Sequence, residues 1–416
     1  MIRHIVRLLW NRKRHNVLIG LEIFISYLVL FGVMLFAVSY ATYYRYPLGY
    51  DINRVWRVGI RSDFRNDRDE DKAAGRQAVQ QVLLALRDLP QVEAVAGAFT
   101  APYENASWGS GMKVNGKQYD YGVNEVTDAY CDVINLKLIA GRWFSRDDDG
   151  VSWDPVVMNA MLAREMFGTT NVVGRSFHRD LDPQDKKMST EDEARMRREM
   201  RVVGVIEDFR QHGELSRPES FMFHRMRLDD PTKGAPRELV LKVRPGTTAD
   251  FEETLVKTMQ AAAHDWSFEV QETAALRRQN LRNYLVPLAA IGIVAGFLLV
   301  MVALGLTGVL WQNITQRTRE IGLRRAKGAT RVKVHSQILG ELMVITTAAL
   351  LVAGVLVAQA PLLPWQVPER VIPPTSVMLI SMALSAACIY GLTLLCGWYP
   401  SRLATSVDPA DALRYE

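Results

Sequence analysis

Residues 283 to 316, NYLVPLAAIGIVAGFLLVMVALGLTGVLWQNITQ, form a run without one charged side chain. A helix needs about 20 apolar residues to cross about 30 Å of hydrocarbon, so this run is long enough to span a membrane and to continue beyond it. The preceding residues, TAALRRQNLR at 273 to 282, contain no helix breaker, and Pro287 is tolerated in a membrane helix as a kink. We therefore expect one long helix in which a stalk leads into the span.

Three more apolar runs are long enough to cross a bilayer. Residues 17 to 44 carry only Glu22 as a charge, residues 336 to 360 carry only Glu341, and residues 371 to 401 carry none. The first run is too long for a cleaved signal peptide and lacks a small-residue cleavage site. The sequence therefore predicts four transmembrane helices, at residues 17–44, 283–314, 336–360 and 374–398.

Basic residues orient these spans. Residues 1 to 16 contain five Lys and Arg and no acidic residue, and residues 313 to 335 contain seven basic residues and one acidic residue. Because positive segments stay in the cytoplasm, we expect the N-terminus, the 315–335 loop and the 399–416 tail inside the cell. Residues 45–282 and the short 361–373 loop then lie outside.

The first sixteen residues have a second feature. Ile2, Ile5, Val6 and Leu9 follow helical spacing, with basic residues elsewhere, which predicts an amphipathic helix on the inner leaflet. A basic flank that only fixes orientation is the simpler alternative.

The external residues 45–282 show one pattern twice. It begins with a β-type run at 54–60, continues with a helix that has Val79, Val82, Leu83 and Leu86 on one side, and ends with a strand candidate at 92–100. The second set follows later, at 238–244, about 249–263 and 267–272. Two such β-α-β units predict an α+β domain with ferredoxin-like organisation. Residues 126–200 read as an inserted subdomain that ends in a charged, solvated excursion at 183–200.

No pattern in the chain indicates catalysis or metal binding. Cys131, Cys388 and Cys396 form no disulfide framework, the histidines are scattered, and no CxxC or HExxH spacing occurs. Asp147, Asp148 and Asp149 lack the spacing of a calcium loop, which favours a surface turn. No G-x-x-x-x-G-K-[ST] phosphate loop is present, so we expect neither bound ATP nor enzymatic activity in this chain.

The basic stretch QRTREIGLRRAKGATRVKVH, residues 316 to 335, admits several functions. Glu320 and Arg324 can pair on a short helix that ends near Gly328, and Thr330 is placed to begin the next helix. Nucleic-acid binding is disfavoured because the stretch has no aromatic stacking platform. A loop that contacts anionic lipid and a helix that docks a cytoplasmic partner both remain open.

Three groups of residues resemble the FtsX-like permease family. The C-terminal residues 399–416 are similar to the family's closing segment. The external stretches 141–144, 156–159, 167–168, 174 and 202–205 resemble a MacB-type periplasmic domain. The signature loop of the family is matched by Arg319, Glu320, Ile321, Gly322, Leu323, Arg324, Arg325, Ala326, Lys327, Gly328 and Ala329.

This resemblance implies a subunit of an ABC transporter in a bacterial inner membrane. Members are four-span permeases that work as dimers, homomeric or mixed, and transmit the movement of two ATPase subunits to their external domains. The loop around residues 316–330 would be the coupling helix that contacts the ATPase. MacB-type proteins carry the ATPase ahead of the first span, whereas sixteen residues precede the span here, so a separate ATPase with its ATP and magnesium is expected.

Several functions fit a permease of this kind. The two-part external domain favours export of peptides, drugs or similar substrates from the periplasm, with a periplasmic adaptor or lipoprotein as a further partner. Lipoprotein release and control of a cell-wall hydrolase are alternatives, and a sensor or scaffold that does not transport is a fourth.

Overall fold

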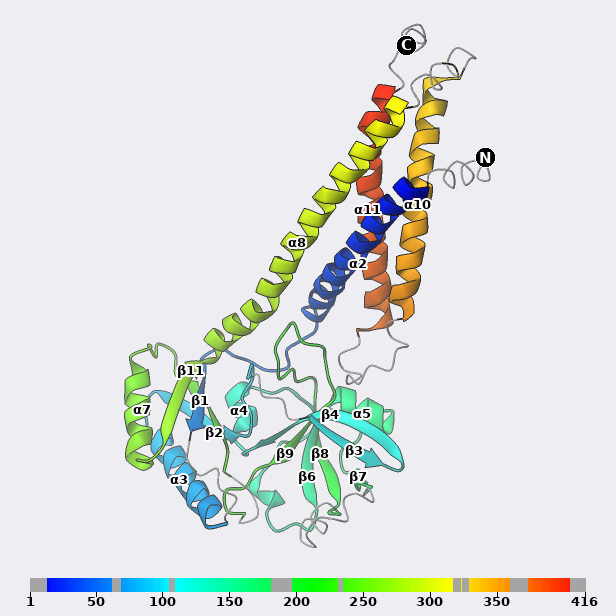
Figure 1. The fold of residues 1–416 in the computed structure, drawn as a ribbon. Helices are drawn as coiled ribbons and strands as arrows, with labels where there is room; N and C mark the ends of the chain where they lie inside the picture. Colours follow the sequence, from blue (N-terminus) through cyan, green and yellow to red (C-terminus); the bar gives the residue numbers. More distant parts are fainter. Residues whose placement is uncertain are drawn as a thin grey trace. The chain divides into compact units, whose positions relative to one another are not determined.

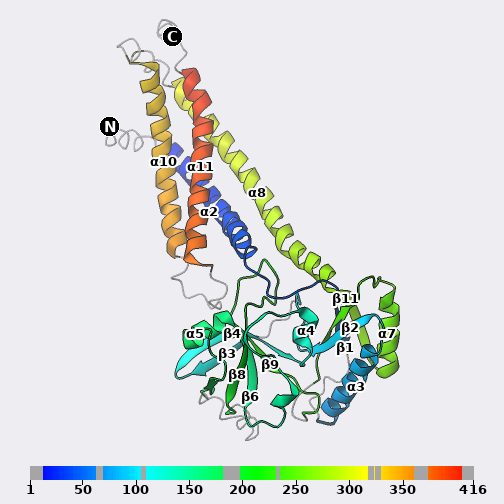
Figure 2. The same ribbon diagram turned by 180° about the vertical axis from the view of Figure 1, so that it is seen from behind.

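The computed structural model describes residues 13–61, 69–104, 109–180, 197–230, 235–316, 323, 329–359 and 373–404. The chain divides into two compact units, and Figures 1 and 2 show the elements of each. We call residues 43–283 the head, and residues 1–42 with 284–416 the membrane unit. Most of the expected amphipathic helix at 1–16, of the charged excursion at 183–200 and of the external loop at 361–373 lies outside the described residues.

In the part of the chain that the structure describes, four helices are long and apolar enough to cross a membrane, which confirms the predicted number of spans. They are α2 (Lys13–Tyr43), α8 (Thr273–Gln316), α10 (Arg331–Gln359) and α11 (Thr375–Ala404). α8 is one helix with Pro287 inside it, and it includes both the residues predicted as a stalk and those of the predicted span. α10 begins directly after Thr330, whose carbonyl accepts the N–H groups of Lys333 and Val334.

Within the membrane unit, buried residues of α2 follow helical spacing at Ile19, Ile23, Tyr27 and Leu30. α10 and α11 pack side by side, and Thr346 and Thr393 exchange a hydroxyl hydrogen bond between them. α2 and α8 approach each other at Gly305, where an added Cβ would lie 2.6 Å from a carboxylate oxygen of Glu22. Glu22 therefore lies against a neighbouring helix.

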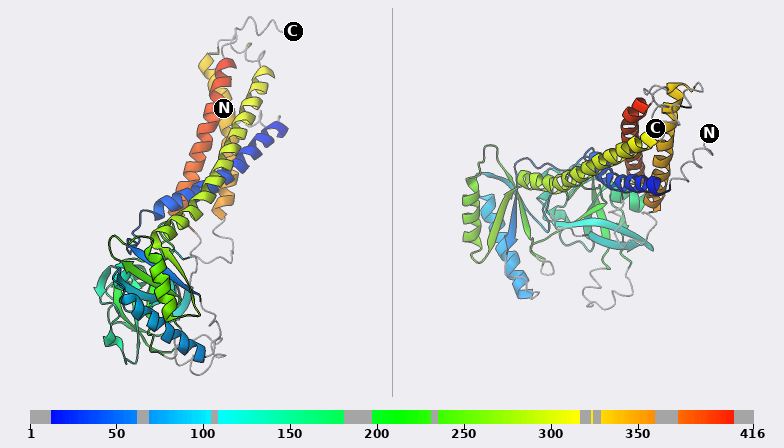
Figure 3. Two further views of the ribbon diagram at one scale, coloured as in Figure 1. Left: turned by 90° about the vertical axis from the view of Figure 1, so that its left-hand side faces the viewer. Right: turned by 45° about the horizontal axis from the view of Figure 1, so that its top comes forward.

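The first half of the head has the ferredoxin-like organisation that the sequence predicts. Its elements are β1 (Val55–Arg61), α3 (Asp69–Arg87), β2 (Val92–Ala98), β10 (Glu238–Val243), α7 (Phe251–Ala262) and β11 (Ser267–Glu272). The strands follow the order β11-β1-β10-β2 and are antiparallel throughout. α3 and α7 pack against this sheet and each other, as Figure 3 shows, and the predicted apolar face of α3 is buried there.

The second half of the head continues the same sheet in the order β4-β9-β6-β8-β5. Where the two halves join, Ala98 of β2 lies opposite Val126 of β4, and backbone hydrogen bonds from Phe99 to Glu125 and from Thr127 to Gly97 flank this pair. The strands are β3 (Gly109–Val114), β4 (Lys117–Val126), β5 (Leu138–Gly141), β6 (Asp154–Asn159), β7 (Ser176–Phe177), β8 (Met200–Ile206) and β9 (Phe221–Arg225). Short helices are α4 (Tyr130–Ile134), η1 (Arg146–Asp148) and α5 (Ala160–Phe167).

The strand bounds show that the inserted subdomain extends beyond the predicted residues 126–200 at both ends. The reason is that β4 begins before that range and β9 follows it, and the two strands pair in parallel, with Gly122 opposite Phe221. Pairing between strands so far apart in sequence leaves no local pattern.

Two stretches that resemble the MacB-type domain pack against each other in this half. Arg142 donates its backbone N–H to the carbonyl of Val203. An added Cβ on Gly141 would lie 2.3 Å from the Val203 oxygen, and one on Gly204 would lie 2.2 Å from the Arg142 oxygen. Both glycines are therefore required by the close approach of two backbones.

The three-aspartate turn differs from the surface turn that the sequence predicts. Asp148 is 3% exposed and accepts from the guanidinium of Arg142, and Asp149 accepts from Arg225. The local spacing indicated a turn correctly, but it gave no sign of the two arginines that make these carboxylates structural.

Candidate functional site: a buried arginine in the head

The site predicted from the sequence, residues 319–329 between α8 and α10, is described only at two positions. Leu323 is 48% exposed and Ala329 is half-buried. The other nine residues of the motif lie outside the described residues, so their contact with an ATPase stays a prediction.

A second candidate site lies in the head around Arg210, in the loop that follows β8. The Arg210 side chain is 1% exposed and donates to four backbone carbonyls. Its Nη1 donates to Tyr43 at 2.8 Å and Tyr46 at 3.2 Å, and its Nη2 donates to Glu214 at 2.6 Å and to Ser216. Arginine suits this position because its planar guanidinium presents several donors in a fixed fork.

The segment that leaves α2 packs closely on this loop. Gly49 has a φ of +89°, and an added Cβ would lie 2.0 Å from the carbonyl oxygen of Asp208. The next residue, Tyr50, donates its hydroxyl to the Arg210 carbonyl at 3.1 Å and stacks on Phe209. The chain that follows α2 is thus bound to the loop through both backbone and side-chain contacts.

The start of α8 contacts the same loop. Arg277, in the second turn of α8, donates from Nε to Oε1 of Glu214, and Leu276 packs against the apolar core of the head. Gly213 approaches the ring of Tyr103 so closely that an added Cβ would lie 2.4 Å from it. We call the loop Glu207–Ser216, with these contacts to residues 43–50 and to α8, the junction.

Burial dominates the electrostatics of the junction. Burial lowers the pKa of the Arg210 guanidinium, although the side chain keeps its charge at any physiological pH. Burial also raises the pKa of Tyr50 and of Tyr103, and the negative charge of Glu214 raises the pKa of Tyr103 further. Both phenols are therefore neutral hydrogen-bonding groups.

Two buried polar atoms of the junction loop, Oε1 of Gln211 and Nε of Arg210, have no hydrogen-bond partner among the described residues. The Tyr103 hydroxyl, in contrast, lies close enough to Glu214 and Tyr50 for both groups to affect its pKa.

Sequence patterns contain only weak signals for this site. A charged residue in a loop reads as exposed, and nothing near Arg210 in the chain indicates that Tyr43 accepts from it across 167 positions. The stretch 202–205, which resembles a MacB-type domain, ends five residues before Arg210. A comparison extended a few residues along the chain would have included Arg210.

In the part of the chain that the structure describes, no group of three His, Cys, Asp or Glu side chains could bind a metal ion.

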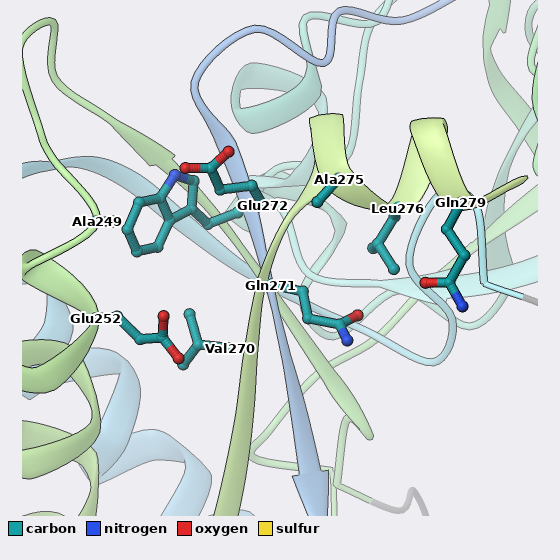
Figure 4. Close-up of a pocket in the computed structure, with 9 residues that line it drawn as sticks. Ala249, Glu252, Val270, Gln271, Glu272, Ala275, Leu276 and Gln279 are labelled. Atoms are coloured by element: carbon teal, nitrogen blue, oxygen red, sulfur yellow. The ribbon is translucent and has the colours of Figure 1, made fainter. Parts of the chain in front are cut away.

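A groove of about 280 Å³ lies close to the start of α8. Figure 4 shows its walls, with Glu252 of α7 on one side of β11 and Gln279 of α8 on the other.

Comparison with known proteins identifies the family. Residues 292–409 match the family model of the FtsX-like permease C-terminal domain. Residues 23–257, more than half of the chain, match the MacB-like periplasmic core domain. The chain belongs to the FtsX-like ABC transporter permeases with a MacB-like core domain. The junction loop of this permease lies inside the second match, whereas β11 and the first turns of α8 lie between the two matched ranges.

Curated relatives of this permease share about a quarter of its sequence. The uncharacterized ABC transporter permease YknZ of Bacillus subtilis is 24% identical over 84% of this chain and 83% of that protein. The macrolide export ATP-binding/permease protein MacB of Chlorobium luteolum is 24% identical over 77% of this chain and 45% of that protein. The permease thus spans about half the length of the MacB relatives that it matches.

Two solved structures are similar to part of this chain. The periplasmic region of MacB from Actinobacillus actinomycetemcomitans aligns with a TM-score of 0.38 and 14% identity, covering 55% of this chain and 93% of that one. The extracellular domain of the transporter YknZ from Gram-positive bacteria aligns with a TM-score of 0.34 and 14% identity, covering 52% of this chain and 99% of that one.

Proposed function

We propose that this permease transmits ATP-driven movement from a separate cytoplasmic ATPase to its head. In this account the permease forms a dimer in the bacterial inner membrane, with both termini in the cytoplasm and the head in the periplasm. ATP and magnesium bind to the ATPase subunit, and the permease contributes the moving parts.

The observation that carries the proposal is the continuity of α8. This single helix runs from Thr273, next to the junction, to Gln316, next to the 319–329 motif. At 1.5 Å per residue its 44 residues extend over about 66 Å. A displacement at the cytoplasmic end of a continuous helix reaches its other end without depending on a chain of separate contacts.

The junction supports the same account at the other end of α8. It binds α8 through Glu214 and Arg277 and binds the chain that follows α2 through Arg210 and Tyr43.

Export of peptides, drugs or similar molecules from the periplasm is the function that we favour. Several relatives carry the name of a macrolide exporter, although each contains a length of chain that this permease does not match. Lipoprotein release and a sensor or scaffold role use the same architecture, so the first experiment addresses coupling to an ATPase, which separates the transporting functions from the sensor or scaffold.

The experiment compares two double variants of the tagged permease, purified from its native membrane in mild detergent. Arg324→Ala with Arg325→Ala alters the motif, and Arg331→Ala with Lys333→Ala removes the same amount of charge just beyond it. We expect the wild type and the second variant to retain an ATPase subunit with vanadate-sensitive turnover, and the first variant to lose it.

Two results would contradict the proposal. Equal loss in both variants would indicate that the loop acts through its total charge, as a lipid-contacting segment does. A wild-type permease that purifies alone and inactive in several detergents would favour the sensor or scaffold role.

A further inference from the structure

The strand β11 has a free edge. It stands at the end of the strand order, and among the described residues it pairs on one side only, with β1. The outward backbone groups of an edge strand are a template for another strand. Proteins use such edges to bind extended peptide segments, in which backbone hydrogen bonds give affinity and side-chain pockets give specificity.

The groove near the start of α8 runs along this edge. Three consecutive residues of β11, namely Val270, Gln271 and Glu272, line it. Successive side chains of a strand point to opposite faces of the sheet, so a groove that touches all three passes the edge of the strand. Figure 4 shows this arrangement, with Val270 on the α7 side of β11 and Gln271 on the opposite side.

The rest of the lining provides apolar and polar contacts on either side of the edge. Trp56 of β1 lies opposite Glu272 in the strand pair and is nearly buried, and Leu276 of α8 lies on the other wall. The volume of about 280 Å³ is slightly below the range of about 300 to 1,000 Å³ that suits drug-sized ligands. The groove therefore fits one or two side chains of a longer segment better than a whole small molecule.

The charged residues that line the groove indicate which kind of peptide segment it can bind. Glu252 and Glu272 are exposed, and the nine residues that line the groove include no Lys, Arg or His. Gln271 is already engaged, because it accepts from Arg57 and donates to Glu269. The two glutamates are thus the charged groups that an incoming side chain meets, and they complement Lys or Arg.

We propose that an extended, basic segment of a partner protein adds to β11 as an additional strand and places a Lys or Arg side chain between Glu252 and Glu272. β11 ends at Glu272 and α8 begins at Thr273, so the docked segment contacts the strand that leads directly into the long membrane helix. This docking surface is independent of the nature of any transported substrate.

The test measures binding of fluorescein-labelled peptides to the full-length permease in a neutral detergent. The probe is the alternating peptide KVKVKV, and the controls are EVEVEV and KVKPKV, whose proline removes a backbone donor and leaves all three lysines in place. We expect KVKVKV to bind and to slow amide hydrogen exchange in residues 268–272. The proline peptide should bind about tenfold more weakly, and EVEVEV should show no binding.

Variants locate the site. Glu252→Gln with Glu272→Gln should weaken binding of KVKVKV about tenfold or more. Glu253→Gln is the matched control, because Glu253 is the next residue of α7, is exposed and pairs with Lys257 outside the groove. This control should bind like the wild type.

Three results would overturn the proposal. Equal binding of KVKPKV would show that strand addition is not the mode of binding. Unchanged affinity in the double variant would place the peptide elsewhere. If spermidine and unlabelled KVKVKV displace the labelled peptide at the same concentration of positive charge, the groove is a simple cation site.

Discussion

Arg210 donates from Nη1 to the backbone carbonyl of Tyr43 at 2.8 Å, so a buried cation of the head binds the last residue of α2. Arg210 also donates to Tyr46, Glu214 and Ser216. One side chain therefore satisfies four backbone carbonyls that belong to two segments far apart in sequence. This arrangement makes the junction sensitive to any change at Arg210.

Replacement of Arg210 by leucine should destabilise the head strongly. The variant leaves buried carbonyls without donors, and each buried group left unsatisfied costs about 1–3 kcal/mol. Thermal unfolding followed by tryptophan fluorescence measures the change. Arg164→Leu is the control, because Arg164 is exposed on α5, and it should change stability by less than about 0.5 kcal/mol. If the two variants are equally stable, Arg210 does not stabilise the junction.

Gly49→Ala should destabilise the permease much more than Gly116→Ala. Both glycines have positive φ angles, +89° and +78°, so both substitutions carry a strain of about 1 kcal/mol or more. Only at Gly49 does the new Cβ meet backbone, 2.0 Å from the Asp208 oxygen, whereas nothing lies within 4 Å at Gly116. Similar unfolding temperatures for the two variants would argue against tight packing of the α2 exit on the junction.

Glu238 should make the stability of the head depend on pH. Burial raises the pKa of Glu238 to about 7, against the lowering effect of Arg57, which donates to both of its oxygens at 2.7 and 2.8 Å. The folded state then binds a proton that the unfolded state releases near pH 4.5, so this contribution to stability is lost as pH rises from about 4.5 to about 7.

The measurement is the unfolding temperature of the wild type and of Glu238→Gln between pH 4.5 and 8. The decrease contributed by this group is expected to be about 1–3 kcal/mol and to be absent in the variant. Parallel pH profiles of the two proteins would show that the Arg57 ion pair keeps Glu238 charged throughout.

Pro287→Ala should stiffen α8. Proline has no N–H, so the carbonyl of Asn283 lacks its usual helical donor, and alanine restores it with a local gain of about 3 kcal/mol. Amide exchange in residues 283–290 should slow by about tenfold or more. Pro400→Ala in α11 is the control and should leave this segment unchanged. Exchange that stays as fast as in the wild type would show that Pro287 creates no weak point.

Local patterns were sufficient to predict the four membrane helices and the first half of the head. The apolar face at Val79, Val82, Leu83 and Leu86 packs as its helical spacing indicates, because short connections let β1, α3 and β2 form together. The second half was predicted less well, since β4 pairs in parallel with the distant β9. Arg210 was missed because its burial depends on carbonyls that only the folded chain brings together.

Hydrogen exchange in the permease purified with its ATPase, compared without nucleotide and after trapping with ATP and vanadate, shows whether ATP-driven movement reaches the head. If α8 transmits movement, trapping should change exchange in residues 43–50, 207–216 and 273–283. The Arg331→Ala, Lys333→Ala variant, which is expected to retain the ATPase, should show the same change, whereas the Arg324→Ala, Arg325→Ala variant, purified without the ATPase, should show no change on adding ATP and vanadate. Unchanged exchange in these segments, in a complex that hydrolyses ATP, would contradict the account.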